Sequence, residues 1–126
     1  MRIIVFTVFL TILVVGFAWY SMEYLQVSSG KIIQQLDALE KQISDENWHE
    51  AQQSLAGIAA YWNEIHKNWK LLIDHRETDE IEIAITRLKS AFRAKEQGDA
   101  LAELAVLRFY LEHIPAKERV LLRNIF

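Results

Sequence analysis

The sequence predicts an all-α protein, in which an N-terminal transmembrane helix precedes a small bundle of about four antiparallel helices arranged as two α-hairpins. Three observations support this prediction. Proline occurs once and glycine four times in 126 residues, and residues that favour helices dominate. The N-terminal segment, residues 3–20, carries no charge. The rest of the chain contains apolar stripes at spacings of three and four residues, the period of one helix face.

Length and composition limit the kinds of protein this can be. Beyond the N-terminal segment about a hundred residues remain, which is enough for one small core but not for a second domain. The 14 Lys and Arg residues are outnumbered by 17 Asp and Glu residues, so a basic face that binds phosphates is not expected. Cysteine is absent, which excludes disulfides and thiolate metal sites. We therefore expect no nucleic-acid partner and no cofactor.

Residues 1–22 are expected to form a membrane anchor. The 18 uncharged residues 3–20 would extend about 27 Å as a helix, close to the thickness of the hydrocarbon core of a bilayer. Arg2 precedes this segment, and Glu23 is the first charged residue after it. The positive-inside rule therefore predicts a single-pass protein of the cell membrane, with the N-terminus inside and the C-terminal domain extracytoplasmic.

A cleaved secretory signal is the alternative interpretation of the same segment. Gly16 and Ala18 give a small-x-small pattern, and Arg2 supplies the positive start of a signal. Trp19 and Tyr20 continue the segment beyond that pattern, and aromatic residues suit the far membrane interface. They favour an uncleaved anchor.

Residues 23–30 are expected to be a short connector, and residues 31–126 the extracytoplasmic domain. Serines and a glycine close the connector, and Ser29 is a candidate N-cap for a first bundle helix over residues 31–43. Whether this helix continues the membrane span directly stays open, although Gly30 favours a break.

The main helix of the bundle is expected over residues 46–74. Ser44 or Asp45 can cap its start. Its tryptophans should lie in the core, with Trp48 partly exposed because it is in the first turn. One face carries the apolar stripe on which the other helices pack. This stripe consists of Trp48, Ala51, Leu55, Ile58, Trp62, Ile65, Trp69, Leu72 and Arg76.

Two further helices are expected, over residues 79–97 and 100–114. Each has an apolar stripe, and Gly98 between them suits the residue that stops a helix. Pro115 either kinks the last helix or opens a short final one. In both cases residues 117–126 form a tail with enough apolar residues that it should pack against the rest of the protein.

One polar corner concentrates the candidate functional residues, Asp74, His75, Glu77 and Asp79. The spacing fits no established metal or catalytic motif, so we assign no catalytic or metal-binding residue. The structural interpretation is that the main helix ends near His75 and Thr78 caps the next one. The functional interpretation is a corner that binds a partner.

Several features of the sequence belong together: the N-terminal anchor, part of the apolar stripe, the polar corner and the end of the chain. Their residues are Trp48, Ala51, Leu55, Trp62, Asp74, His75, Glu77, Ile81, Asn124, Ile125 and Phe126. Together they resemble a family of small membrane-anchored helical proteins, a domain of unknown function found in spore-forming Firmicutes. The resemblance covers nearly the whole chain and implies a bacterial cell-membrane protein. It also implies a small multi-pass membrane protein of the YetF type as genomic neighbour and partner, and it implies no activity. Thr78 departs from the family pattern, in which Ile or Val is expected.

The leading functional hypothesis is a membrane-anchored accessory protein that binds a membrane protein partner. It uses the polar corner and the C-terminal Asn124, Ile125 and Phe126, and it predicts that an exposed apolar patch survives folding. The apolar stripes are also compatible with a homo-oligomer.

Two other hypotheses belong to different classes. An extracytoplasmic sensor or small-ligand-binding bundle would need a pocket lined by Trp62, His66 or Tyr110. An enzyme would use the carboxylates and histidine of the corner for proton transfer, but the sequence has no nucleophile motif or phosphate loop. We therefore do not expect an enzyme.

Overall fold

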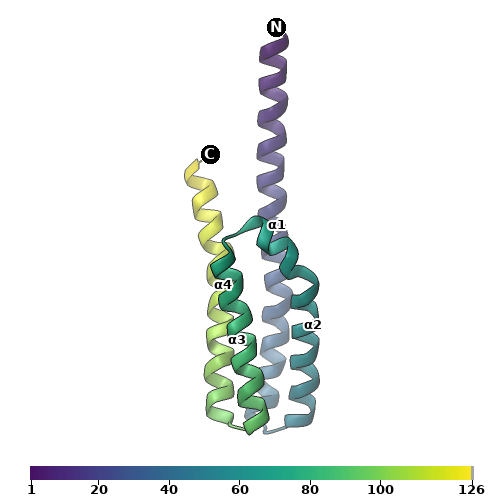
Figure 1. Cartoon of the computed structure of the whole chain (residues 1–126), viewed down its shortest axis with the longest axis vertical. Helices are drawn as coiled ribbons and strands as arrows, with labels where there is room; N and C mark the ends of the chain where they lie inside the picture. The colour runs from purple at the N-terminus through teal and green to yellow at the C-terminus, as the bar shows by residue number, and fades with distance from the viewer. Residues whose placement is uncertain (126) are drawn as a thin grey trace.

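The computed structural model describes residues 1–125 as four helices joined by short turns (Figure 1). Each helix contacts two others: α1 packs against α2 and α4, and α3 packs against the same two. The chain therefore runs up and down around a single four-helix bundle. The prediction of an all-α protein with a long apolar first helix is confirmed. The helices are α1 Arg2–Ser44, α2 Trp48–Leu72, α3 His75–Ala94 and α4 Gln97–Ile125.

Helix α1 is continuous over 43 residues, so the predicted connector over residues 23–30 is wrong. Ser29 is not an N-cap but a buried residue in the middle of the helix, and the helix continues through Gly30. The serines are accommodated because their hydroxyls bond to backbone carbonyls, as Ser28 Oγ does to Tyr24 O at 2.6 Å. The N-terminal segment and the first bundle helix are thus one rod.

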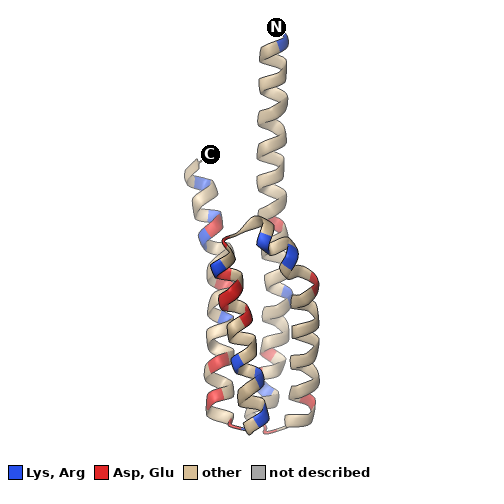
Figure 2. Cartoon of the chain, viewed as in Figure 1, with Lys and Arg blue, Asp and Glu red and all other residues tan. Residues whose placement is uncertain are grey.

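The N-terminal half of α1 projects beyond the bundle (Figure 1). A stretch of 18 residues in this half has a mean hydropathy of 2.5, and none of these residues is buried. Between Arg2 and the bundle it carries no charged residue (Figure 2). The helix is therefore long and apolar enough to cross a membrane, a property that a signal sequence shares.

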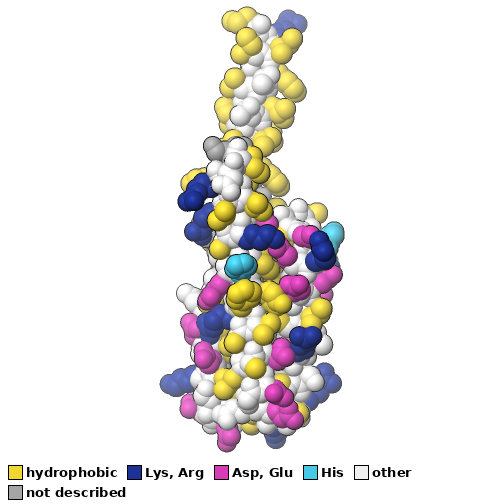
Figure 3. All heavy atoms as spheres, turned by 90° about the vertical axis from the view of Figure 1, so that its left-hand side faces the viewer, with side chains coloured by type: hydrophobic (Ala, Val, Ile, Leu, Met, Phe, Trp, Pro, Cys, Tyr) yellow, Lys and Arg dark blue, Asp and Glu magenta, His cyan; other side chains and the backbone are white. Residues whose placement is uncertain are grey.

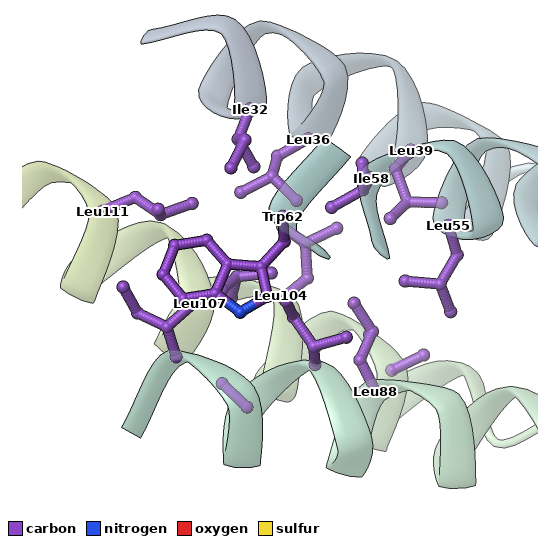
Figure 4. Packing of buried hydrophobic residues seen from close by; sticks show 14 of the residues in the cluster. Ile32, Leu36, Leu39, Leu55, Ile58, Trp62, Leu88, Leu104, Leu107 and Leu111 are labelled. Carbon is purple, nitrogen blue, oxygen red and sulfur yellow. The ribbon is translucent and has the colours of Figure 1, made fainter. Parts of the chain in front are cut away.

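The core lies inside the bundle, and the predicted stripe of α2 forms one side of it. Trp62 and Trp69 are 2% and 0% exposed and meet edge to face with ring centroids 5.4 Å apart. Trp62 lies among apolar side chains of the other helices, including Leu107 and Leu111 (Figure 4). Trp48 is half-buried. The placement of the three tryptophans confirms their prediction, and burial of each large ring contributes about 1.5–3 kcal/mol.

The α1–α2 turn begins later than the sequence predicts. Ser44 is the last residue of α1, and Asn47, not Ser44 or Asp45, caps α2 with its side-chain oxygen 3.5 Å from the Glu50 backbone nitrogen. Glu46 closes the turn in the left-handed region, with φ 55°. Because the turn is made at Glu46, this residue cannot also begin the helix, which starts at Trp48.

The α3–α4 turn lies earlier than expected. Lys95 adopts the left-handed conformation, with φ 51°, and ends α3. Gly98 does not stop a helix, because it is already inside α4. The side-chain amide nitrogen of Gln97 donates to the carbonyls of Ile43 and Ser44, at 3.1 and 3.0 Å. This side chain caps the end of α1 and joins the two turns at that end of the bundle.

Pro115 does not open a separate short helix, because α4 runs through it to Ile125. Of the two expected alternatives, the one in which the last helix continues past the proline therefore holds, and this helix is longer than the expected 100–114. A proline in a helix has no N–H, so the carbonyl four residues earlier, that of Leu111, lacks its usual donor. The buried hydroxyl of Ser29 donates to this carbonyl at 2.8 Å. The neighbouring Ser28 accepts from the indole N–H of Trp69 at 2.9 Å. Two adjacent serines therefore join α1 to α4 and to α2.

We predict that Ser29→Ala destabilises the protein by about 1–3 kcal/mol, because the Leu111 carbonyl is left buried without a donor. In a Pro115→Ala background most of this loss should disappear, because the substitution restores a backbone N–H that can donate to the same carbonyl. The measurement is the free energy of unfolding in urea of the full chain in non-ionic detergent, followed by circular dichroism. Ser90→Ala, at an exposed helical serine, is the control. Equal losses in both backgrounds would contradict the prediction.

Candidate functional site

The predicted polar corner lies at the end of the bundle from which the N-terminal half of α1 emerges (Figure 1). It is the first turn of α3, and not the end of α2 as expected. Helix α2 ends at Leu72 and Asp74 caps α3, with Asp74 Oδ1 accepting from the Arg76 backbone N–H at 2.9 Å. This backbone hydrogen bond lowers the pKa of Asp74. The cap forms here because Asp74 is extended, with ψ 137°, which leaves Thr78 inside the helix.

Thr78 is fully buried, and its hydroxyl donates to the His75 carbonyl at 2.8 Å. It therefore does not cap a helix, and it fills a core position. His75 and Asp79 are exposed on the surface of the corner. These two side chains are accessible to a partner.

Glu77 connects the corner to α4. Its Oε1 accepts from Lys117 Nζ at 2.6 Å, with 16% of the Glu77 side chain exposed against 51% of Lys117. This hydrogen bond raises the pKa of Lys117. Burial, followed by the nearby charge of Glu77, raises the pKa of Glu118. Two carboxyl groups are therefore held close together where α4 leaves the bundle.

The predicted C-terminal residues lie further along α4. From Lys117 to Ile125 the helix advances about 12 Å, so the structure does not bring the corner together with the end of the chain. Asn124 is exposed and Ile125 is 73% exposed. The expectation that the tail packs on the protein therefore holds only for its first part, where Lys117 pairs with Glu77 and Leu122 is half-buried. It is wrong for the exposed residues at the end of α4, and Phe126 lies outside the described residues.

Helix α4 carries a second apolar stripe that was not predicted from the sequence. Its members recur at spacings of three and four, opposite the core stripe, and all are exposed. Phe109 is 57% exposed, and its ring stacks on His113 with centroids 5.0 Å apart. Figure 3 shows hydrophobic side chains and a histidine along this side of the molecule, with charged groups on both flanks. We call Ala102, Ala105, Val106, Phe109, His113, Ala116 and Val120 the outer stripe.

The other proposed sites have little geometric support. Within residues 1–125 no three His, Asp or Glu side chains lie close enough to share a metal ion. Trp62 fills the core instead of lining an open pocket. The Nδ1 of His66 lies 2.9 Å from the Asn63 carbonyl of its own helix.

We predict that Glu118→Gln flattens the pH dependence of stability. Because the folded pKa of Glu118 is raised, its stabilising contribution is present below pH about 4.3 and is lost as pH rises through the folded value. At pH 7 the variant should be at least as stable as the parent protein. The measurement is the urea midpoint between pH 4 and pH 7, with Glu112→Gln on an exposed residue of the same helix as the control. A lower midpoint at pH 7 would contradict the prediction.

The comparisons with known proteins agree with the sequence-based resemblance at the level of the family. Residues 19–125 match the family described as a domain of unknown function (DUF4363). No curated protein and no solved structure matches the chain. The match covers all four helices except the first part of α1. The chain therefore belongs to the DUF4363 family.

Proposed function

We propose that this chain is a membrane-anchored accessory protein that binds an integral membrane protein at the surface of a bacterial cell, as expected for a protein of spore-forming Firmicutes. The observation that carries the proposal is the outer stripe of α4. An exposed apolar surface flanked by charged groups is typical of a protein interface. The aromatic ring of Phe109 at its centre, 57% exposed, is the kind of residue that dominates binding energy.

The anchor is the N-terminal half of α1, and it is uncleaved. Arg2 on one side and Glu23 on the other support an N-terminus inside and a bundle outside. Because α1 is one helix, cleavage at Ala18 would cut through a continuous rod. From Trp19 to Ser44 this rod extends about 38 Å. It would hold the bundle upright on the membrane, so that the outer stripe faces sideways toward neighbouring membrane proteins.

The partner surface that fits this stripe is another apolar helix face. Helix α4 presents residues at helical spacing, and a partner helix that lies along it would contact several of them at once. Arg108, next to the stripe, is held by ion pairs to Asp37 and Glu40 of α1 at 2.6 and 3.1 Å. These ion pairs fix one edge of the stripe. The exposed corner residues His75 and Asp79 add a polar contact near the membrane.

We predict that Phe109→Gln combined with Val106→Gln lowers partner recovery by roughly tenfold or more, because the centre of an interface carries most of its energy. Both residues are exposed, so the fold should be retained. The measurement is mild-detergent co-purification of the tagged full chain from native membranes. Ile83→Gln, on a residue of α3 that is 49% exposed, is the matched control.

Recovery of one membrane protein with the control but not with the double variant supports the proposal. Equal recovery with both variants contradicts the assignment to the outer stripe. A second, differently tagged copy of the chain should be expressed in the same cells. If this copy is recovered in place of another membrane protein, the partner is the chain itself and the proposed partner class is wrong.

We also predict that His75→Ala combined with Glu77→Ala leaves the helical circular-dichroism signal intact but lowers partner recovery. His75 is exposed, and the Glu77 ion pair reaches a half-exposed lysine, so the loss of stability should be small. His49→Ala with Glu50→Ala is the matched control, because these exposed residues occupy the first turn of α2 at the other end of the bundle. Loss of the helical signal in the corner variant would show that the corner is structural.

A further inference from the structure

A groove lies between α1 and α4 where both helices extend beyond the bundle. Its volume is about 430 Å³, and α1 contributes Val15, Ala18, Trp19 and Met22, while α4 contributes Leu122. These side chains make the floor of the groove apolar. A groove of this kind in water would be unfavourable, whereas hydrocarbon would fill it without loss.

Two arginines of α4, Arg119 and Arg123, also line the groove. Both are exposed, and within residues 1–125 neither forms an ion pair. The one carboxylate in the lining is that of Glu23, which lies beyond the apolar segment of α1. The groove therefore combines an apolar floor with a net positive rim, which suits a ligand that has a hydrocarbon part and an anionic part.

The height of the groove along α1 follows from two contacts between the helices. Ser29 of α1 bonds to Leu111 of α4, and Ile43 of α1 bonds to Gln97 of α4. Between these two contacts the antiparallel helices advance by the same number of residues. Continuing α4 past Leu111 at the same rate places Arg119 level with about Ser21 of α1, and Arg123 about one turn further toward the N-terminus of α1.

This height is that of the membrane interface if the N-terminal half of α1 spans the bilayer. Trp19 and Tyr20 mark the end of the uncharged segment, where aromatic residues sit among head groups. Long arginine side chains can extend from slightly deeper positions to the same level. Leu121 and Ile125 are 46% and 73% exposed, and they would face the acyl chains, as in an interfacial amphipathic helix.

We propose that this groove binds one anionic phospholipid. An acyl chain lies along Val15, Ala18 and Leu122, and the phosphate accepts hydrogen bonds from the guanidinium groups of Arg119 and Arg123. A zwitterionic head group would bring a cationic group beside the two arginines, so the anionic lipid is preferred. This inference rests on the proposed membrane anchor, but it requires no protein partner.

The test uses the purified full chain in neutral detergent micelles that contain equal amounts of dioleoyl phosphatidylglycerol and dioleoyl phosphatidylcholine. Native mass spectrometry measures which lipid the protein retains. We expect one phosphatidylglycerol to be preferred, and Arg119→Gln with Arg123→Gln to lower this preference roughly tenfold, as expected for lost charge-assisted contacts. Arg87→Gln with Lys89→Gln removes the same charge from exposed residues of α3 and should leave the preference unchanged.

The outcomes separate the possible failures. Absence of a preference in the parent protein, or equal loss in both double variants, would overturn the lipid site. Displacement of phosphatidylglycerol by excess inorganic phosphate would also overturn it, because the groove would then recognise the free anion alone. Carbonate extraction of native membranes tests the anchor separately: release of the full chain would disprove the anchor, whereas retention without lipid preference would disprove only the groove.

Discussion

The hydrogen bond from Ser29 to the Leu111 carbonyl is the constraint on which the arrangement of this protein depends. It compensates for the donor that Pro115 removes from α4, and so it allows one uninterrupted helix where proline would otherwise favour an end. Since α4 continues to Ile125, it reaches the height at which α1 leaves the bundle. The Glu77 to Lys117 pair, the α1–α4 groove and the exposed end of α4 all follow from that continuation.

The helices could be predicted because the stripes of Trp62, Leu88 and Leu104 show the period of a buried helix face in the local sequence. Their ends could not be predicted equally well. Ser28 and Ser29 look like connector residues until their partners are known, and those partners, Trp69 and Leu111, lie far away in the chain. Asp74 and Thr78 are both good caps by residue type. The extended backbone of Asp74 and the burial of Thr78 distinguish them, and both depend on the fold. Lys95 ends α3 although the neighbouring Gly98 is the more usual residue for that role.

Only part of the candidate site could be predicted from the sequence. A local concentration of charge marked the corner, but the sequence placed it at the end of α2 and not in the first turn of α3. Its link to α4 through Lys117 depends on the fold. The outer stripe was visible as a second series at helical spacing, and it was missed because each helix was expected to carry one apolar face. Whether such a series can bind a partner depends on its exposure, which is set by the packing of the other helices and not by the sequence of α4 alone. Phe109 and Leu107 are both apolar, yet Phe109 is 57% exposed and Leu107 is 0% exposed.

The continuity of α1 has a mechanical consequence. A protein with a flexible joint after its anchor can reorient freely, but this bundle has no hinge between the apolar segment and its own first helix. Any tilt of the apolar segment is therefore transmitted to the far end of the bundle, as by a lever. For an arm of about 38 Å, a tilt of roughly 20° would displace Ser44 sideways by about 13 Å. If α1 spans a membrane, as we propose, a change in bilayer thickness that alters its tilt would change how far the bundle reaches across the membrane surface.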